Sequence, residues 1–92
     1  MARVQLTSVF SGQVQSVGFR ATVWALTRKL RVTGYVRNEP DGTVLMKALG
    51  EDAELDRLLK AIQDSRLGPL IRKASHQRGP MVEEFDRFEI RY

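Results

Sequence analysis

Residues 12–20, Gly-Gln-Val-Gln-Ser-Val-Gly-Phe-Arg, combine glycines and an arginine in a pattern suited to binding an anion. Gly12 and Gly18 let the backbone wrap closely around a ligand, and the residues beyond them predict the start of a helix. The unpaired N–H groups and the dipole at a helix N-terminus favour negative charge. Arg20 adds a fork of donors that fits a phosphate. On these residues alone, a phosphate-sized site and an ordinary strand-to-helix loop with an exposed arginine are both open.

Basic residues are concentrated in the first part of the chain. Residues 1–38 hold six Lys and Arg side chains and no acidic one, and all eleven acidic residues follow them. This asymmetry, with a net charge of +4, favours an anionic ligand for the first part. The cations of residues 28–31 also have a simpler explanation, because positive charge stabilises a helix C-terminus. That explanation does not cover Arg20.

The composition excludes several classes of site. A chain of 92 residues fits one compact domain, which we expect to span residues 1–92. There is no cysteine, so disulfides, thiolate zinc sites and a cysteine nucleophile are excluded, and a single histidine, His76, excludes a histidine-rich metal centre. The longest apolar run, residues 23–26, is far shorter than a membrane span or a signal-peptide core. We therefore expect a soluble, cytoplasmic monomer without a membrane partner.

Two segments have the apolar spacing of helices. The first has an apolar stripe at steps of four, three and four, formed by Phe19, Val23, Leu26 and Leu30. It is predicted to end near Val32, with Gly34 as its C-terminal cap. The second is predicted to begin at a capping Asp52 and to end at Gly68-Pro69. Its apolar face is formed by Leu55, Leu58, Leu59 and Ile62.

The remaining apolar segments are typical of strands. They are residues 4–10, 35–38, 43–49, 70–77 and 85–92. Pro40-Asp41-Gly42 predicts the tight turn that joins the second and third of them as a hairpin. The order is β-α-β-β-α-β with an additional C-terminal strand. It predicts an α+β, ferredoxin-like sandwich: an antiparallel sheet with two helices on one face.

The anion-binding segment also resembles a family signature. Residues 12–20 look like the first signature of the acylphosphatase family, Gly-x-Val-Gln-Gly-Val-x-Phe-Arg. Residues 34–38, Gly-Tyr-Val-Arg-Asn, with Gly42, Val44 and Gly50 after them, look like the second. Both occur in the family's order and spacing, and the resemblance runs from the first predicted strand to the last. The length resembles the stand-alone enzyme, and not the related module of a much larger hydrogenase-maturation protein.

The resemblance implies hydrolysis of acyl phosphates to carboxylate and inorganic phosphate, by an acylphosphate phosphohydrolase that its product phosphate inhibits. It assigns phosphate binding to the backbone amides of a loop and to the side chain of Arg20. The residues concerned are Gln15, Ser16, Val17, Gly18, Phe19 and Arg20. It assigns the positioning of the attacking water to Asn38. A carboxylate leaves without a general acid, and the Asn38 amide can align a water although it cannot accept a proton as a base. This chemistry needs no metal or cofactor.

One position departs from the family pattern. Ser16 stands where the family usually has glycine. If the residue needs positive φ, serine costs roughly 1–2 kcal/mol there. Alternatively, the loop differs slightly and the Ser16 hydroxyl donates to the phosphate. Either outcome affects the rate more than the fold.

Two other functions compete with hydrolysis. Ferredoxin-like sheets with positive charge also bind RNA, but RNA-recognition sheets display aromatic side chains on their central strands, and residues 43–49 contain none. We therefore expect a small-molecule substrate and no nucleic acid. A non-catalytic phosphate-binding relative is the other alternative, which Arg20 and Asn38 argue against and Ser16 keeps open. His76 lies outside both motifs and is expected to be a surface or strand-edge residue.

Overall fold

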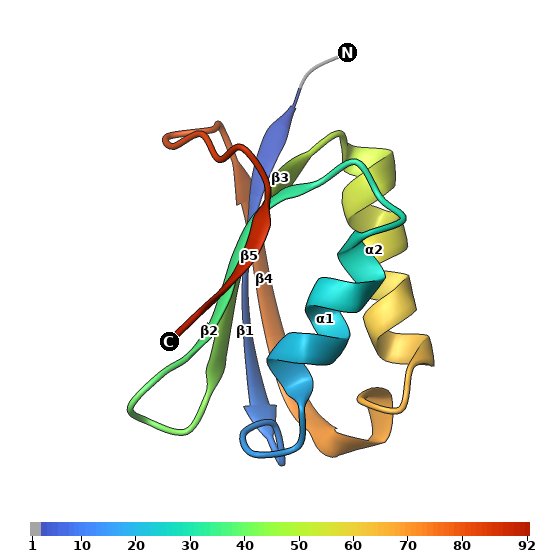
Figure 1. The fold of residues 1–92 in the computed structure, drawn as a ribbon, viewed down its shortest axis with the longest axis vertical. Helices are drawn as coiled ribbons and strands as arrows, with labels where there is room; N and C mark the ends of the chain where they lie inside the picture. Colours follow the sequence, from blue (N-terminus) through green and yellow to red (C-terminus); the bar gives the residue numbers. More distant parts are fainter. Residues whose placement is uncertain (1–2) are drawn as a thin grey trace.

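The chain folds into a five-stranded sheet with two helices packed on one face (Figure 1). The structure is a computed structural model that describes residues 3–92. In chain order the elements are β1 (Val4–Gly12), α1 (Phe19–Thr27), β2 (Thr33–Asn38), β3 (Val44–Gly50), α2 (Asp52–Asp64), the 3₁₀ turn η1 (Gly68–Leu70), β4 (Ile71–Gly79) and β5 (Phe88–Arg91). The predicted β-α-β-β-α-β order with an additional strand is confirmed.

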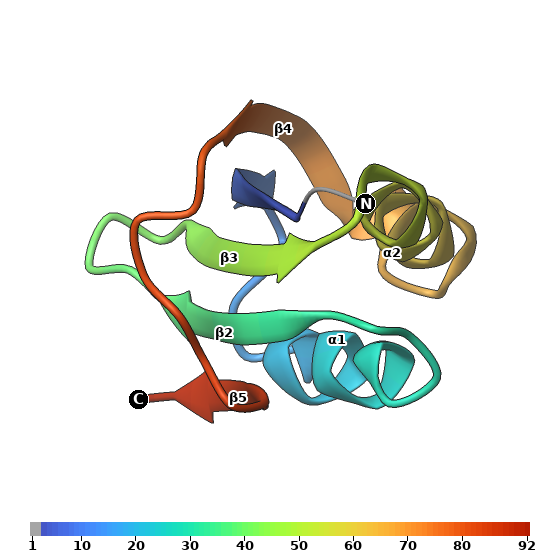
Figure 2. The ribbon, with the colours of Figure 1, turned by 90° about the horizontal axis from the view of Figure 1, so that it is seen from above.

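The sheet is mixed, so the prediction of a purely antiparallel sheet is wrong in this detail. Its strand order is β4-β1-β3-β2-β5. All neighbours are antiparallel except β2 and β5, which run parallel with Val36 opposite Ile90. The reason is the connection through residues 80–87, which reverses the chain after β4. It crosses the sheet on the side away from the helices (Figure 2). β5 therefore runs opposite to β4, which is the direction of β2.

The core lies between the helices and one face of the sheet. Alternate residues of β1, Leu6, Ser8 and Phe10, are buried on this face. The predicted stripe of α1 packs onto it, with Phe19 and Val23 buried and the rest of the stripe partly buried. α2 contributes Leu55, Leu58 and Ile62, as predicted. Burial of each large apolar side chain contributes roughly 1.5–3 kcal/mol, which holds the β1–α1 connection in place.

Several helix boundaries differ from the predicted ones. α1 ends at Thr27, and Gly34 is a residue of β2 and not a helix cap. Gly34 has φ 135°, and a Cβ there would clash with the Lys47 carbonyl of β3, so glycine is required by close strand pairing. The N-cap of α2 is Glu51, while Asp52 is the first helical residue and accepts a hydrogen bond from Arg78. No helix within residues 3–92 is long and apolar enough to cross a membrane.

Candidate active site

A pocket of about 140 Å³ lies where β1 leads into α1. This connection is at the lower end of the ribbon in Figure 1. Its lining comes from three segments far apart in the sequence: Val14, Ser16, Gly18, Phe19, Arg20, Ala21, Asn38, Ile90 and Tyr92. This volume suits a phosphate-sized group and is well below the roughly 300–1,000 Å³ of pockets for drug-sized ligands. Of the predicted phosphate-binding residues, Ser16, Gly18, Phe19 and Arg20 line the pocket, together with Asn38, whereas Gln15 and Val17 do not.

The loop between β1 and α1 presents a run of free backbone donors. Its first fixed point is the hydrogen bond from Gln13 N–H to the Leu70 carbonyl at 2.9 Å, and its last is from Thr22 N–H to the Gly18 carbonyl at 3.0 Å. Between them, the N–H groups of residues 14–18 donate to no backbone acceptor within residues 3–92. The first-turn N–H groups of a helix also lack intrahelical partners. The lining of the pocket is therefore rich in unpaired donors.

The backbone conformation of this loop favours an anion. Ser16 has φ 62° and Gly18, the N-cap of α1, has φ 74°, while Val17 between them is not in the positive-φ region. Left-handed residues in a tight turn are one element of the concave arrangements of successive N–H groups that bind anions, called nests. Ser16 is the sole non-glycine residue with positive φ in the described part of the chain. The strain considered for this serine is therefore present.

Arg20 is held in place by the end of β5. Its Nη1 donates to the Arg91 carbonyl oxygen at 3.0 Å, and its guanidinium carbon lies 4.6 Å from the centre of the Tyr92 ring. Both contacts restrict a long side chain that would otherwise sample many rotamers. A guanidinium has five N–H donors. Those that Arg91 does not use are available to a ligand in the pocket.

Asn38 ends β2 on the same side of the sheet as the core residue Val36, two positions before it. The side chain of Gln15 fixes the adjoining hairpin, because its Nε2 donates to the carbonyl oxygens of Glu39 at 2.8 Å and Thr43 at 2.9 Å. The Gln15 side chain therefore does not face the pocket, and its backbone N–H is the group left for a ligand. These two hydrogen bonds set the position of Asn38 relative to residues 13–18, the connection between β1 and α1, which we call the donor loop.

Comparison with known proteins agrees with this geometry. The acylphosphatase family model matches residues 6–90. The chain belongs to the acylphosphatase family. It is 35% identical to the acylphosphatase of Archaeoglobus fulgidus over 89 residues, covering 97% of this chain and 99% of that one. It is 38% identical to that of Methanospirillum hungatei over 91 residues, covering 99% and 98%. The crystal structure of acylphosphatase from Bacillus subtilis superposes with a TM-score of 0.88 at 29% identity, covering 97% and 99%.

Membership of the acylphosphatase family confirms the resemblance and the expected class of enzyme, a hydrolase of acid anhydrides. The pocket of this acylphosphatase contains residues that sequence reasoning did not assign to it, above all Tyr92 and Ile90. The alternation Phe88, Ile90, Tyr92 places all three on one face of the last strand. The sequence did not predict that this strand pairs with β2. Val36 and its parallel partner Ile90 are 54 positions apart, and no local sequence pattern indicates such a pairing.

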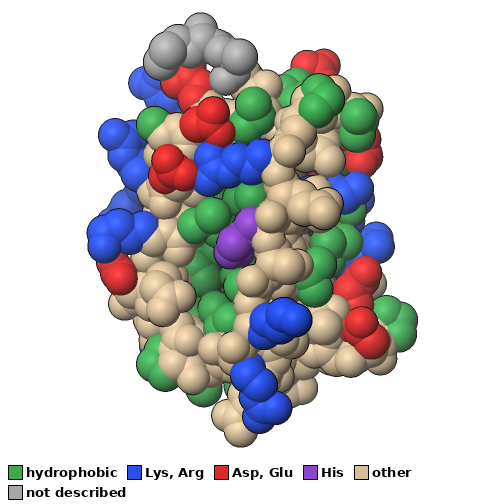
Figure 3. Space-filling view, turned by 180° about the vertical axis from the view of Figure 1, so that it is seen from behind, with side chains coloured by type: hydrophobic (Ala, Val, Ile, Leu, Met, Phe, Trp, Pro, Cys, Tyr) green, Lys and Arg blue, Asp and Glu red, His purple; other side chains and the backbone are tan. Residues whose placement is uncertain are grey.

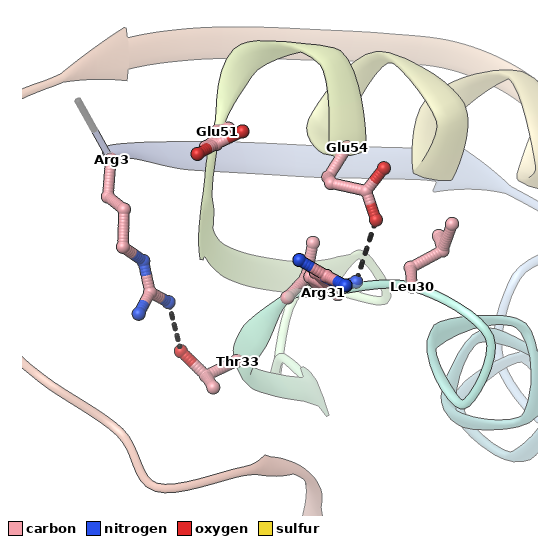
Figure 4. Close-up of a pocket in the computed structure, with 7 residues that line it drawn as sticks. Arg3, Leu30, Arg31, Thr33, Glu51 and Glu54 are labelled. Atoms are coloured by element: carbon pink, nitrogen blue, oxygen red, sulfur yellow. Dashed lines mark hydrogen bonds between the residues drawn. The ribbon is translucent and has the colours of Figure 1, made fainter. Parts of the chain in front are cut away.

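A second, larger pocket lies at the other end of the molecule, between the α1–β2 connection and the start of α2 (Figure 4). Its volume is about 340 Å³, and it is lined by both charge types, including Arg3, Arg31, Glu51 and Glu54. Glu54 accepts a hydrogen bond from the Arg31 backbone N–H at 2.8 Å, and this bond lowers the pKa of the Glu54 carboxyl. Two carboxylates repel a phosphate. The smaller pocket, whose lining includes Arg20 and no acidic residue, is the better candidate for an anion.

His76 lies on β4, outside the active-site pocket, as expected for a strand-edge residue (Figure 3). Its Nδ1 is 2.7 Å from the Oγ of the buried Ser8, and its ring meets Phe10 edge-on. Burial lowers the pKa of His76, and the neighbouring Arg78 lowers it further. Within residues 3–92, no three or more His, Asp or Glu side chains are grouped as metal ligands would be.

Proposed function

We propose that the chain hydrolyses acyl phosphates, binding the phosphate with the backbone N–H groups of residues 15–20 and the side chain of Arg20, and positioning the attacking water with Asn38. The observation that carries this proposal is one pocket lined by three features: the donor loop, Arg20 and Asn38. The family match supports the reaction. The roles of the individual residues are inferred from their chemistry.

The donor loop and Arg20 supply positive potential where the phosphate carries negative charge. Main-chain N–H groups are fixed dipoles, so they stabilise an anion without reorganising, and the dipole of α1 adds to them. The guanidinium of Arg20 matches two phosphate oxygens with two parallel donors. In the transition state the charge spreads over the three equatorial oxygens of the transferred group. Hydrogen-bond donors arranged around those oxygens accelerate transfer of the phosphoryl group to water.

Asn38 has the chemistry to align the water without removing its proton. An amide side chain offers one acceptor and one donor group, which fix the orientation of a water molecule. The water oxygen forms a bond to phosphorus while the bond from phosphorus to the acyl oxygen breaks, and that electron pair leaves with the carboxylate. The proton of the water passes to an oxygen of the phosphate. A carboxylate is stable at neutral pH, so the leaving group needs no acid.

Hydrolysis of benzoyl phosphate tests this function. We expect turnover that inorganic phosphate inhibits competitively, and we expect the same rate in the presence of a chelator. Glycerol phosphate, a monoester whose alkoxide leaving group needs an acid, serves as the matched control and should be turned over far more slowly. Binding of phosphate without hydrolysis of benzoyl phosphate would instead favour a non-catalytic phosphate-binding protein.

We propose no nucleic-acid partner for the sheet. In RNA-binding ferredoxin-like sheets the open face stacks bases on aromatic side chains. In this chain the connection through residues 80–87 crosses that face (Figure 2). The one aromatic side chain of β2, Tyr35, is covered by Phe85 with ring centres 5.6 Å apart and by the Arg91 guanidinium at 4.0 Å. A base would have to displace both groups.

A further inference from the structure

Arg66 forms a hydrogen bond with the backbone of the donor loop, although it does not line the pocket. It lies between α2 and η1, and its Nη2 donates to the Val17 carbonyl oxygen at 2.8 Å and to the Thr22 Oγ1 at 3.0 Å. The same nitrogen lies against Gly18, where an added Cβ would come within 2.9 Å of it. One side chain therefore joins the loop to the first turns of α1.

The backbone that carries Arg66 is fixed on both sides. On one side, the hydroxyl of Ser65 donates to the Ile62 carbonyl at 2.6 Å and accepts from the Leu67 N–H at 3.1 Å. On the other, Leu67 is fully buried, and Gly68 packs so closely against the Gln63 carbonyl that no side chain fits. The Cα of Arg66 is therefore held in a fixed position, which limits where its guanidinium can lie.

Hydrogen bonding to the Val17 carbonyl also orients the next N–H group. In a trans peptide the C=O and the N–H of the same unit point in opposite directions. By holding the Val17 oxygen outward, Arg66 directs the N–H of Gly18 away from itself. Gly18 lines the pocket, and its N–H donates to no backbone acceptor within residues 3–92. The hydrogen bond from Arg66 thus orients the Gly18 N–H, one of the groups proposed to donate to the phosphate.

We infer that Arg66 is a positioning residue for phosphate binding, which rests on the proposed function of the loop. It acts through the Val17–Gly18 peptide and does not touch the substrate. Without it, the loop samples conformations in which the Gly18 N–H is misdirected, and only the competent fraction binds. A fall in that fraction lowers the apparent affinity for every phosphate ligand by the same factor. It leaves the turnover rate of the enzyme–substrate complex unchanged.

The test compares Arg66→Ala with Arg66→Lys and with Arg57→Ala. Arg57 is an exposed residue of α2 paired with Glu54, so its removal makes the same change in net charge away from the pocket. For Arg66→Ala we expect the KM for benzoyl phosphate and the inhibition constant of phosphate to rise together by about five- to tenfold, with kcat changed less than about twofold. Arg66→Lys, which keeps a donor on a shorter chain, should recover part of the loss. Arg57→Ala should change neither constant.

A nuclear magnetic resonance titration of the Gly18 amide gives an independent measurement. Phosphate should shift this signal in the wild type, and the midpoint in Arg66→Ala should rise by the factor seen in kinetics. Thr22→Val removes the second acceptor and is used if Arg66→Ala does not fold; it should weaken phosphate binding in the same direction and less.

Equal phosphate affinity in Arg66→Ala and the wild type would overturn the role of Arg66 and leave the proposed function intact. Equal weakening in Arg57→Ala would also overturn it, because net charge would then explain the effect. A wild type that neither binds phosphate nor hydrolyses benzoyl phosphate would overturn the proposed function, and the role of Arg66 with it.

Discussion

The guanidinium carbon of Arg20 lies 4.6 Å from the centre of the Tyr92 ring, and the two residues come from opposite parts of the sequence. The same guanidinium donates to the Arg91 carbonyl at 3.0 Å. Arg20 is therefore held by the segment at β5 and not by its own helix. We propose that its remaining donors bind the phosphate.

Replacing Arg20 tests its part in phosphate binding. Arg20→Ala should raise the inhibition constant of phosphate and lower kcat/KM by on the order of 100- to 1,000-fold, the scale for loss of a donor aimed at transition-state charge. Arg20→Lys should not restore activity, because a point charge lacks the two parallel donors of the fork. Steady-state kinetics with benzoyl phosphate measures both. Full rescue by lysine would show that charge alone is needed.

Tyr92 should contribute through its ring and not through its hydroxyl. Tyr92→Leu removes the face on which Arg20 lies and should lower kcat/KM by about two- to fivefold, since a cation–π contact at an exposed site contributes roughly 0.5–1 kcal/mol. Tyr92→Phe keeps the ring and is the matched control, expected to behave as the wild type. A loss in the phenylalanine variant equal to that in the leucine variant would assign the effect to the hydroxyl.

Asn38 should affect turnover and leave phosphate binding almost unchanged. Asn38→Ala removes both the donor and the acceptor that align the water, so kcat should fall by on the order of 100-fold or more. The inhibition constant of phosphate should stay within about twofold, because the donor loop and Arg20 are untouched. Normal turnover in this variant would mean that another residue positions the water.

Ser16 should be replaceable by glycine without loss. Its φ of 62° is strained for a serine, so Ser16→Gly should be neutral to stabilising in urea unfolding even though glycine adds entropy to the unfolded chain. Phosphate affinity and kcat should stay the same or improve. If turnover instead fell about tenfold and phosphate binding weakened by roughly 1 kcal/mol, the size of one hydrogen bond, the hydroxyl would be a phosphate donor.

His76 should make the fold sensitive to mild acid. Burial lowers its pKa below the ordinary value of 6.5, so the native state favours the neutral ring that contacts Ser8. The resulting stabilisation is complete above pH 6.5 and is lost as the pH falls below this value towards the native pKa. In His76→Gln, the decline in unfolding free energy between pH 7.5 and pH 5.0 should be smaller than in the wild type. Parallel curves for the two proteins would contradict this expectation.

The parts of the site that local sequence determines were predictable. Glycine spacing, the onset of the apolar stripe at Phe19 and the strand that ends at Asn38 are short-range features, and they identified the donor loop and its neighbours. The Gln15 side chain was not predictable, because its acceptors lie 24 and 28 residues away on the hairpin. Arg66 reaches Val17 across 49 residues for the same reason. Gly34 was misassigned because glycine after an apolar stripe fits a helix cap as well as a crowded strand.

Arg20 and its acceptor on Arg91 are 71 positions apart in the sequence, and we expect this separation to affect how activity is gained during folding. Contacts between distant residues carry a high entropic cost and tend to form late. An intermediate with β1, β2, β3 and both helices in place would already present the donor loop and Asn38, with Arg20 still free to move. Under the role proposed for Arg20, full activity requires docking of the β5 segment, so we expect regain of activity to follow the pairing of β5 with β2 and not the assembly of the other strands alone.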